Sequence, residues 1–322
     1  MNASMIPMAD TQAPEWLEAL PKVRGSYKYN FMMGDICWFR VGGPADVVFL
    51  PADEADLAAF LKKLPQDIPV HIVGAGSNTL VRDGGIRGVV IRLGAQQAQI
   101  EKTSDTILKA GAGALDVRLA RVALDHGLSG LEFYRGIPGA IGGAIAMNAG
   151  AYGGETADRL LRVEGLTRDG EKLVLTPEDL ALSYRHNGYD DFIIYTAAHF
   201  EAVAGDKETI RAAMQDISDK RETTQPIKSR TGGSTFKNPA GTAPDGPKSW
   251  QLIDAAGCRG ARVGGAQVSE LHCNFLINHG TATASDLEEL GEMVRDKVQQ
   301  QSGVDLHWEI RRIGERGEAH HG

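Results

Sequence analysis

The sequence predicts an α+β fold with a separate lobe that begins at about residue 221. Strand-like and helix-like patterns alternate along the first two-thirds of the chain. The stretch from Pro226 to Pro247 is rich in glycine, proline, serine and threonine, a composition typical of a long loop region. Beyond it, one long helix pattern and one alternating strand pattern close the chain.

Hydrophobic periodicity predicts the elements of the first part in turn. Leu161–Leu166 and Glu171–Leu175 flank Asp169-Gly170, which predicts a β-hairpin. The other predicted elements are a short helix at Trp16–Leu20, strands at Ala45–Leu50, Val70–Val73, Val89–Leu93, Thr106–Ala110 and Phe192–Val203, and helices at Asp53–Leu64 and Glu208–Lys220.

One further helix, after Ala110, has a clear amphipathic pattern. We expect its apolar face to be buried and its charged face to be exposed. The apolar face is formed by Leu115, Leu119, Val122 and Ala123, and the charged face by Asp116, Arg118, Arg121 and Asp125.

The C-terminal part has well-marked element boundaries. Ser285 and Glu288 have the spacing of a capping box, which predicts the start of a helix that Gly303 ends. The segment 304–311 then alternates apolar and polar residues, which predicts a strand with one buried face.

Composition and charge argue against several classes of protein. The net charge of −8 disfavours binding to nucleic acid or to an anionic membrane. Cys37, Cys258 and Cys273 are widely spaced, so we expect reduced thiols and neither a disulfide framework nor a metal site. The N-terminus lacks a secretory pattern, and no stretch reaches the roughly 18–20 uninterrupted apolar residues of a membrane helix. We therefore expect a cytoplasmic protein.

Two glycine-containing stretches are candidate cofactor sites. VGAGSN at 73–78 follows a predicted strand, so its backbone N–H groups suit a phosphate, although a plain turn explains it as well. The stretch 136–154 holds seven glycines, five alanines and no charge. Such bare backbone allows close approach of a ligand, and we prefer a cofactor cradle over a close-packed crossover.

Three side chains are candidates for chemistry, each with a plainer alternative. Ser234 follows two glycines but lacks the G-x-S-x-G pattern of a serine nucleophile. It therefore suits a proton relay or a loop cap instead. Arg185 lies between Tyr184 and Tyr189 and suits an anion clamp or the surface. Glu309 falls on the polar row of the last strand, where a solvated edge is the default interpretation.

Together, these stretches resemble the UDP-N-acetylenolpyruvoylglucosamine reductases of bacterial cell-wall synthesis. The resemblance covers about residues 30–314 and rests on motifs that occur in order. They are FRVGGPAD (39–46), VGAGSN (73–78), GIPGAIGGAIAMNAGAYGGE (136–155), SYR (183–185), GGSTFKNP (232–239), GGAQVSELHCNFLIN (264–278) and HWEI (307–310).

The resemblance implies an FAD-binding fold of the vanillyl-alcohol-oxidase type, with two α+β subdomains, followed by a smaller α+β substrate-binding domain. We expect a leader at 1–25, an FAD-binding domain at 26–220 (subdomains at about 26–93 and 94–220), a substrate domain at 221–314 and a tail at 315–322. The expected FAD contacts are Val73, Gly74, Ala75, Gly76, Ser77, Asn78, Gly136, Ile137, Pro138, Gly139, Ala140, Gly142, Gly143, Asn148, Ala149 and Gly150.

The resemblance also implies the reaction. NADPH would reduce non-covalent FAD, which would pass hydride from N5 to the enolpyruvyl group of UDP-N-acetylglucosamine-enolpyruvate, a peptidoglycan precursor. Arg185 and Glu309 would stabilise the enolate-like charge, and Ser234 would protonate the carbon beside the carboxylate. Tyr184, Lys237, Asn238 and Arg259 would contact the substrate, and we expect a monomer.

Two departures from the family pattern and two alternative functions accompany this interpretation. Tyr189–Asp191 run directly into a predicted strand, so the chain resembles the short form, which lacks an insertion that brings a tyrosine over the substrate. Arg259 stands where most relatives would have lysine. The alternatives are a flavin oxidase acting on another small molecule and a non-catalytic nucleotide-binding module.

Overall fold

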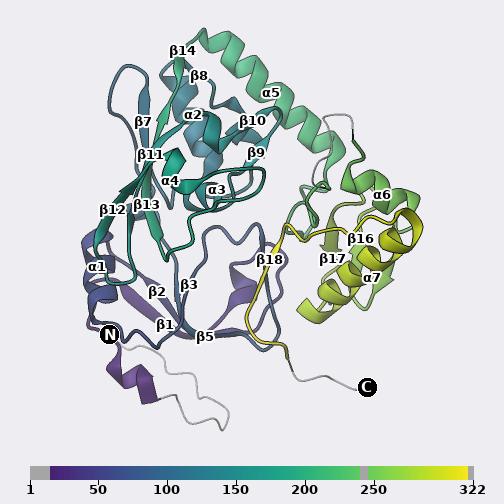
Figure 1. The fold of residues 1–322 in the computed structure, drawn as a ribbon, viewed down its shortest axis with the longest axis horizontal. Helices are drawn as coiled ribbons and strands as arrows, with labels where there is room; N and C mark the ends of the chain where they lie inside the picture. Colours follow the sequence, from purple (N-terminus) through teal and green to yellow (C-terminus); the bar gives the residue numbers. More distant parts are fainter. Residues whose placement is uncertain (1–14, 240–245, 318–322) are drawn as a thin grey trace.

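The computed structural model describes residues 15–239 and 246–317. The chain forms a large lobe (residues 15–224) and a small lobe (residues 225–310), and its last strand returns to the large lobe (Figure 1). Residues 1–14 of the predicted leader, 240–245 of the predicted loop region and 318–322 of the predicted tail lie outside the described residues.

A four-stranded sheet in the order β1-β2-β5-β3 forms the first half of the large lobe. β1 pairs antiparallel with β2, whereas β5 is parallel to both β2 and β3. Asp53 caps the helix between β2 and β3 by accepting a hydrogen bond from Asp56 N, and Phe49 and Phe60 pack between helix and sheet. The elements are β1 (Ser26–Met32), β2 (Pro44–Leu50), α1 (Glu54–Lys63), β3 (Val70–Ile72) and β5 (Ile86–Ile91).

A five-stranded antiparallel sheet in the order β12-β11-β13-β7-β6 forms the second half. Buried side chains from the sheet and its helices, such as Leu108, Leu119, Tyr134 and Phe200, share one core. The elements are β6 (Ile100–Lys102), β7 (Ile107–Gly111), α2 (Asp116–Asp125), α3 (Ile141–Ala146), β11 (Leu160–Leu166), β12 (Lys172–Leu175), β13 (Ile194–Glu201) and α5 (Lys207–Thr224).

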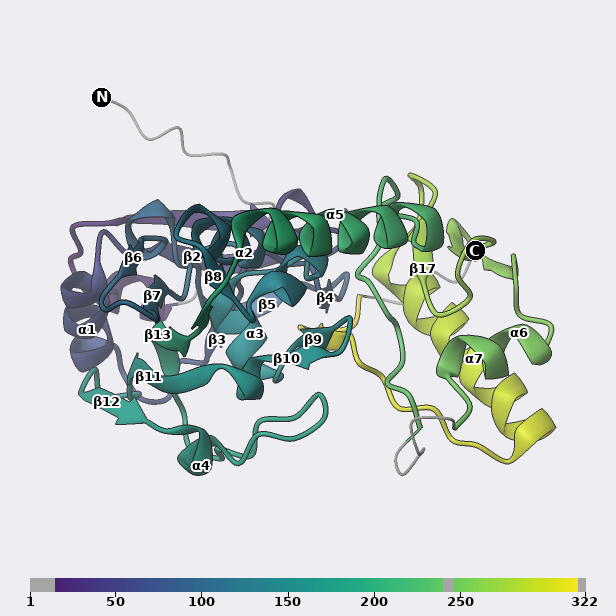
Figure 2. The ribbon, with the colours of Figure 1, turned by 90° about the horizontal axis from the view of Figure 1, so that it is seen from above.

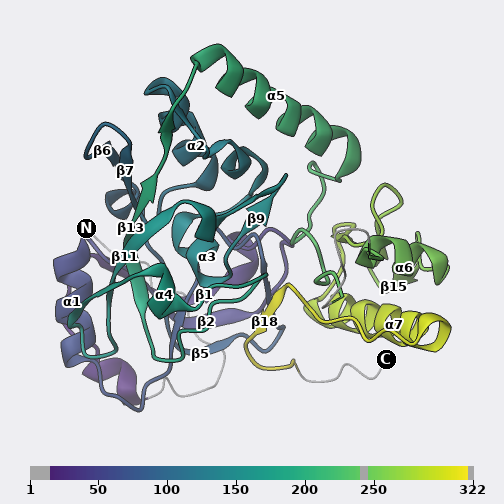
Figure 3. The same cartoon turned by 45° about the horizontal axis from the view of Figure 1, so that its top comes forward.

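Short elements complete the large lobe. They are η1 (Glu15–Ala19), η2 (Met33–Asp35), β4 (Thr79–Val81), η3 (Ala95–Gln97), β8 (Leu128–Ser129), η4 (Glu132–Gly136), β9 (Gly150–Ala151), β10 (Gly154–Glu155), η5 (Thr156–Asp158), α4 (Pro177–Leu180) and β14 (Val203–Ala204). α5 then runs along the large lobe and ends beside the small lobe, as Figures 2 and 3 show.

The small lobe packs two helices against a three-stranded sheet in the order β15-β16-β17. Its elements are α6 (Ser249–Ala255), β15 (Arg262–Val263), β16 (Ala266–Val268), β17 (Leu276–Asn278) and α7 (Ala284–Ser302). The chain then crosses back, and β18 (Arg311–Ile313) pairs in parallel with β4 of the large lobe.

Polar contacts between β4 and α7 connect the lobes. Asp83 accepts hydrogen bonds from Ala284 N (2.9 Å), Ser285 N (2.9 Å) and Ser285 Oγ (2.8 Å), so it binds the N-terminus of α7. Arg82 pairs with Glu288, one turn further along the helix, at 2.9 Å. The start of the longest helix of the small lobe is thus bonded directly to the large lobe.

The predicted α+β class is confirmed, and the predicted strands and helices of the first part are found within a few residues of their expected ends. The Asp169-Gly170 hairpin joins β11 to β12 as expected. Between Pro226 and Pro247, the described residues contain no helix and no named strand.

The predicted faces of α2 are wrong at its first turn. Leu115 precedes the helix and is 46% exposed, whereas Asp116, expected on the charged face, is 0% exposed. The reason is backbone pairing, because Asp116 N donates to Gly139 O (3.1 Å) and Ile141 N donates to Ala114 O (2.9 Å). That pairing turns Asp116 inward and Leu115 outward.

Three further local predictions need correction. The capping box of α7 is formed by Thr283 and Asp286, two residues before the predicted pair, because Ser285 bonds Asp83 instead. Among described residues 304–317, only Arg311–Ile313 form a strand, since 307–310 pair with the loop of Phe236 and not with a sheet. Within the bare stretch, the short helix α3 buries Ile141 and Ile145 and so supplies packing that we did not predict.

Candidate functional site

A cavity of about 140 Å³ between the lobes gathers most of the residues singled out for chemistry. Its lining comes from the SYR loop after α4, from the GGSTFKNP loop, from α6 and the loop after β16, and from the segment before β18. The lining residues are Tyr184, Arg185, Ser234, Phe236, Asn238, Lys248, Trp250, His272, Asn274 and Glu309.

Ser234 is held by backbone pairing on both sides of its loop. It forms an isolated β-bridge with Phe275, and Thr235 N donates to Asn274 O (2.7 Å). The Asn274 side chain accepts from Phe236 N (3.0 Å) and donates to Phe236 O (2.8 Å). Because Asn274 is itself buried, it fixes the position of Ser234 with little freedom.

Arg185 extends across the cavity from a strained backbone position. Its φ of 51° lies in the left-handed region, which an L-residue adopts only at an energetic cost. Its guanidinium donates to Glu309 Oε1 (3.1 Å) and to Gly150 O (2.6 Å). Arg185 therefore links the segment before β18 to the bare stretch.

Glu309 is buried beside Arg185, not on a solvated edge, so its default interpretation is wrong. Its side chain is 12% exposed, and its backbone N–H donates to Thr235 O (2.8 Å). Burial raises the pKa of Glu309 above its usual value, although the Arg185 cation and its hydrogen bond partly oppose that shift. The net effect is a pKa above the usual value of a glutamate.

The four predicted substrate residues do not all lie together. Tyr184 and Asn238 line the cavity, and Lys237 Nζ donates to Arg185 O (3.0 Å), which steadies the arginine loop. Arg259 does not line the cavity and pairs with Asp254 (2.7 Å).

Sequence reasoning missed five lining residues: Phe236, Lys248, Trp250, His272 and Asn274. Phe236 falls within the GGSTFKNP motif. His272 and Asn274 fall within the GGAQVSELHCNFLIN motif, so that motif was the available signal. Lys248 and Trp250 carry no such signal, because only the position of α6 brings them to the cavity. Burial lowers the pKa of His272, which favours the neutral ring.

The two candidate cofactor stretches face each other. A Cβ built on Gly74 would lie 3.8 Å from the Cβ of Ala140, so the VGAGSN turn lies against the bare stretch. Asn78 Nδ2 donates to Glu309 O (3.1 Å) and approaches Met147 Sδ (3.5 Å). The turn, the bare stretch and the glutamate are therefore parts of one assembly.

This assembly has features that suit a dinucleotide. Within the described part of the chain, the backbone N–H groups of residues 74–78 donate no hydrogen bond, so they are available to an anion. A Cβ built on Gly143 would meet nothing within 4 Å, so open space lies above α3. Free donors beside open space fit a bound FAD diphosphate and ring system.

Asn148, predicted to contact FAD, has an internal role in the structure. Its side chain donates to Ser183 O (3.0 Å) and accepts from Ala157 N (2.9 Å), and the residue is fully buried. It thereby fastens the bare stretch to the loop that carries Tyr184 and Arg185.

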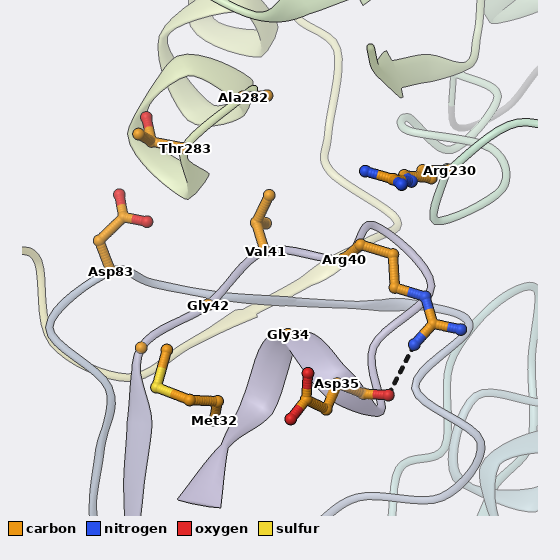
Figure 4. Close-up of a pocket in the computed structure, with 11 residues that line it drawn as sticks. Met32, Gly34, Asp35, Arg40, Val41, Gly42, Asp83, Arg230, Ala282 and Thr283 are labelled. Atoms are coloured by element: carbon orange, nitrogen blue, oxygen red, sulfur yellow. Dashed lines mark hydrogen bonds between the residues drawn. The ribbon is translucent and has the colours of Figure 1, made fainter. Parts of the chain in front are cut away.

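A second, larger cavity of about 530 Å³ lies at another part of the lobe junction (Figure 4). Arg40, Val41, Gly42 and Gly43 of the FRVGGPAD motif line it together with residues that precede α7. Arg40 donates to Asp35 O (2.6 Å), as the dashed line shows. None of the predicted catalytic residues lines this cavity.

The described residues contain neither a metal-binding group nor a membrane-spanning helix. No group of three or more His, Cys, Asp or Glu side chains there is arranged to hold a metal ion. None of the helices in residues 15–239 and 246–317 combines the length and the apolar character needed to cross a membrane.

Comparison with known proteins identifies both parts of the chain. The sequence model described as the UDP-N-acetylenolpyruvoylglucosamine reductase C-terminal domain matches residues 225–313. The model described as an FAD binding domain matches residues 45–176.

Similar whole proteins and a similar structure agree with this result. The UDP-N-acetylenolpyruvoylglucosamine reductase of Parvibaculum lavamentivorans is 56% identical over 97% of this chain and 98% of its own length. That of Methylorubrum extorquens is 54% identical over 92% of this chain and 94% of its own length. The crystal structure of the Thermus caldophilus reductase matches with a TM-score of 0.77 and 33% identity, over 91% of this chain and all of that one. The chain therefore belongs to the UDP-N-acetylenolpyruvoylglucosamine reductase family.

Proposed function

We propose that this protein reduces the enolpyruvyl group of UDP-N-acetylglucosamine-enolpyruvate to give UDP-N-acetylmuramate, with bound FAD as cofactor and NADPH as electron donor. Family membership and the FAD-binding-domain match confirm the expected oxidoreductase of peptidoglycan precursor synthesis and its FAD. The observation that carries the residue assignments is the single cavity that brings Arg185, Ser234 and Glu309 together from three distant segments.

FAD would be held by backbone and not by fixed cations. The free N–H groups of 74–78 suit its diphosphate, and the open space beside Gly143 in the bare stretch leaves room for its rings. When bound and reduced by NADPH, FAD supplies the hydride for the terminal carbon of the enolpyruvyl group.

Arg185 and Glu309 would bind the carboxylate of the substrate and stabilise the negative charge that develops on it. Arg185 contributes a fixed cation, and its strained loop is held by Lys237 and by Gly150 O. Glu309, whose pKa is raised by burial, contributes a proton for a hydrogen bond to the same carboxylate. Preorganised donors of this kind are worth roughly 3–4 kcal/mol each in a site shielded from water.

Ser234 would complete the reaction by giving a proton to the carbon beside the carboxylate. One hydride and one proton then add across the double bond, and the product carboxylate is released. A serine hydroxyl is a weak acid, so its position must be well defined, and Asn274 and Phe275 hold the loop in place. Tyr184 and Asn238 line the same cavity and would contact the rest of the substrate, whereas the substrate contacts of Lys237 and Arg259 remain assignments from resemblance only.

We further propose that the protein acts as a cytoplasmic monomer. Cys37, Cys258 and Cys273 are free and buried, which suits a reducing compartment. Light scattering on the purified protein measures the oligomeric state directly.

The experiment that tests the role of Ser234 separates the two half-reactions by stopped-flow absorbance. In Ser234→Ala, NADPH should bleach the flavin at the wild-type rate, because Ser234 takes no part in that step. Reoxidation by the enolpyruvyl substrate should slow by about a hundredfold or more, as expected for loss of a positioned proton donor. The matched control is Ser229→Ala in the exposed start of the same loop.

Equal losses in both half-reactions would contradict the assignment of Ser234. Faster reoxidation by oxygen than by the enolpyruvyl sugar nucleotide would support the flavin-oxidase alternative. A colourless purified protein that cannot be reconstituted with FAD would support the non-catalytic alternative.

A further inference from the structure

Trp250 is an exposed aromatic side chain in the lining of the cavity that holds Arg185, Ser234 and Glu309. It is 41% exposed, although Ile253, one turn further along the same helix, is fully buried. A single exposed apolar side chain is ordinary on a protein surface, so the exposure alone indicates nothing. The position of Trp250 at the cavity and the contacts that hold it there are more informative.

The cavity has a buried end and an open end. At the buried end, the side chains of Arg185 and Glu309 are 18% and 12% exposed, whereas Tyr184 and Trp250 are largely exposed. The volume of about 140 Å³ is well below the roughly 300–1,000 Å³ of pockets that enclose a whole small ligand. A nucleotide sugar whose enolpyruvyl group reaches Arg185 and Glu309 must therefore extend past the open end.

The loop of Ser234 leads from the buried end towards Trp250. Its later residues bond the start of α6, because Ser249 N donates to Asn238 Oδ1 (3.0 Å) and Ser249 Oγ donates to Lys237 O (2.6 Å). Trp250 follows directly in α6. In the substrate, the sugar carries the enolpyruvyl group, and the diphosphate and ribose separate that sugar from the uracil. The base is therefore the part of the substrate that lies farthest from Arg185 and Glu309.

The Trp250 indole is held in place by its neighbours. Ser249, which precedes it, is fully buried in its bonds to the loop. The ring centroid of Trp250 lies 6.3 Å from that of His272, and the His272 ring lies 4.8 Å from that of Phe275. Phe275 in turn forms the β-bridge with Ser234. A row of rings thus fixes an exposed indole beside the cavity before any ligand binds.

We propose that the uracil base of the substrate stacks on the indole of Trp250, which makes Trp250 a specificity-determining residue for the base. This inference rests on the proposed function and extends it. A planar indole offers a large face to a planar base, and such stacking needs no fixed charge. The sugar is the other ring that an indole could contact, but it carries the enolpyruvyl group and so lies nearer to Arg185 and Glu309.

The test measures binding to the oxidised holoenzyme by isothermal titration calorimetry, with UDP and dihydro-UDP as the two ligands. Dihydrouracil keeps the hydrogen-bonding edge of uracil but is neither planar nor aromatic, so the comparison isolates stacking. The variants are Trp250→Ala and Trp250→Phe. Tyr29→Ala is the matched control, because Tyr29 is an exposed aromatic residue of β1 that lines neither cavity.

We expect the wild-type protein to bind UDP about tenfold more tightly than dihydro-UDP, as one stacked base implies. Trp250→Ala should bind UDP about tenfold more weakly than wild type and should no longer distinguish the two ligands. Trp250→Phe keeps an aromatic face and should bind UDP within about threefold of wild type. Tyr29→Ala should match the wild type for both ligands.

Equal affinities of the wild-type protein for UDP and dihydro-UDP would overturn the proposal, whether or not the variants fold. A Trp250→Ala protein that still prefers UDP tenfold would overturn it too. Wild-type affinity for UDP in Trp250→Ala, with weaker binding only of the complete substrate, would place the indole against the sugar and reject the base contact. Failure of the wild-type holoenzyme to bind UDP at all would reject the proposed substrate instead, so the two failures are distinguishable.

Discussion

Arg185 and Glu309 line one cavity, and the charge of Arg185 affects the pKa of Glu309. Burial favours the protonated form of Glu309, and the Arg185 guanidinium at 3.1 Å favours the ionised form. The raised pKa of Glu309 shows that burial prevails. If Glu309 is protonated as proposed, a substrate carboxylate in this cavity would meet one cation and one hydrogen-bond donor, without a second negative charge to repel it.

The raised pKa predicts the pH dependence of the second half-reaction. Glu309 is protonated below its pKa and loses the proton as pH rises through it. If the proton is needed, the rate of reoxidation by substrate must fall on the alkaline side. Glu309→Gln has no proton to lose, so we expect a rate that is roughly a hundredfold lower but without that decline.

Stopped-flow reoxidation across a pH series measures this profile. The bleaching of the flavin by NADPH serves as the internal control, because Glu309 is not assigned to that step. An alkaline decline that persists unchanged in Glu309→Gln would assign the titration to a group other than Glu309.

At the scale of elements, the short helix α3 is packed against the protein on one side and open on the other. Ile141 and Ile145 bury one side of the helix, while Gly143 opens on the other side, where nothing lies within 4 Å of a built Cβ. Glycine in a helix costs stability compared with alanine. A fold that retains Gly143 at an open position must need that space for something else.

Gly143→Ala therefore separates stability from cofactor binding. In the apoprotein we expect a gain of about 0.5–1 kcal/mol in the free energy of unfolding, from helix propensity alone. We expect the affinity for FAD to fall, because the added methyl group occupies the space proposed for the rings. Urea titration and fluorescence quenching measure the two effects, and unchanged FAD affinity would remove Gly143 from the cradle.

At the scale of the molecule, the site depends on how the two lobes are joined. α7 begins at Asp83 of the large lobe, and β18 returns to pair with β4 directly after the VGAGSN turn. Asn78 of that turn bonds the backbone of Glu309. The proposed FAD cradle and the proposed catalytic carboxyl of Glu309 are therefore connected by contacts that cross the lobe junction.

Removal of FAD should consequently lower the stability of the folded protein. A ligand that binds only the native state at a hundred times its Kd adds about 2.7 kcal/mol to the free energy of unfolding. We expect the urea midpoint to fall on removal of FAD and to recover when FAD is added back, but not when the same concentration of FMN, which lacks the adenylate half, is added. A midpoint that is indifferent to FAD would contradict the cradle.

Much of the fold was predictable because its signals are local. The apolar spacing of α1, the turn at Asp169-Gly170 and the glycine that ends α7 each depend on residues a few positions apart. The order of the motifs was enough to indicate the family. Arg185, Ser234 and Glu309 were singled out by that resemblance, and each had a plainer interpretation when taken alone.

The sequence by itself determined most elements of the large lobe, the long helix α7, the family and the identity of the candidate groups, since these follow from short-range pattern. The tertiary structure alone decided that Glu309 is buried, that Asp116 faces inward at the start of α2, and that Asn274 clamps the loop of Ser234. These facts depend on contacts between residues far apart in the chain. Burial and pKa are set by such neighbours, which no local pattern records.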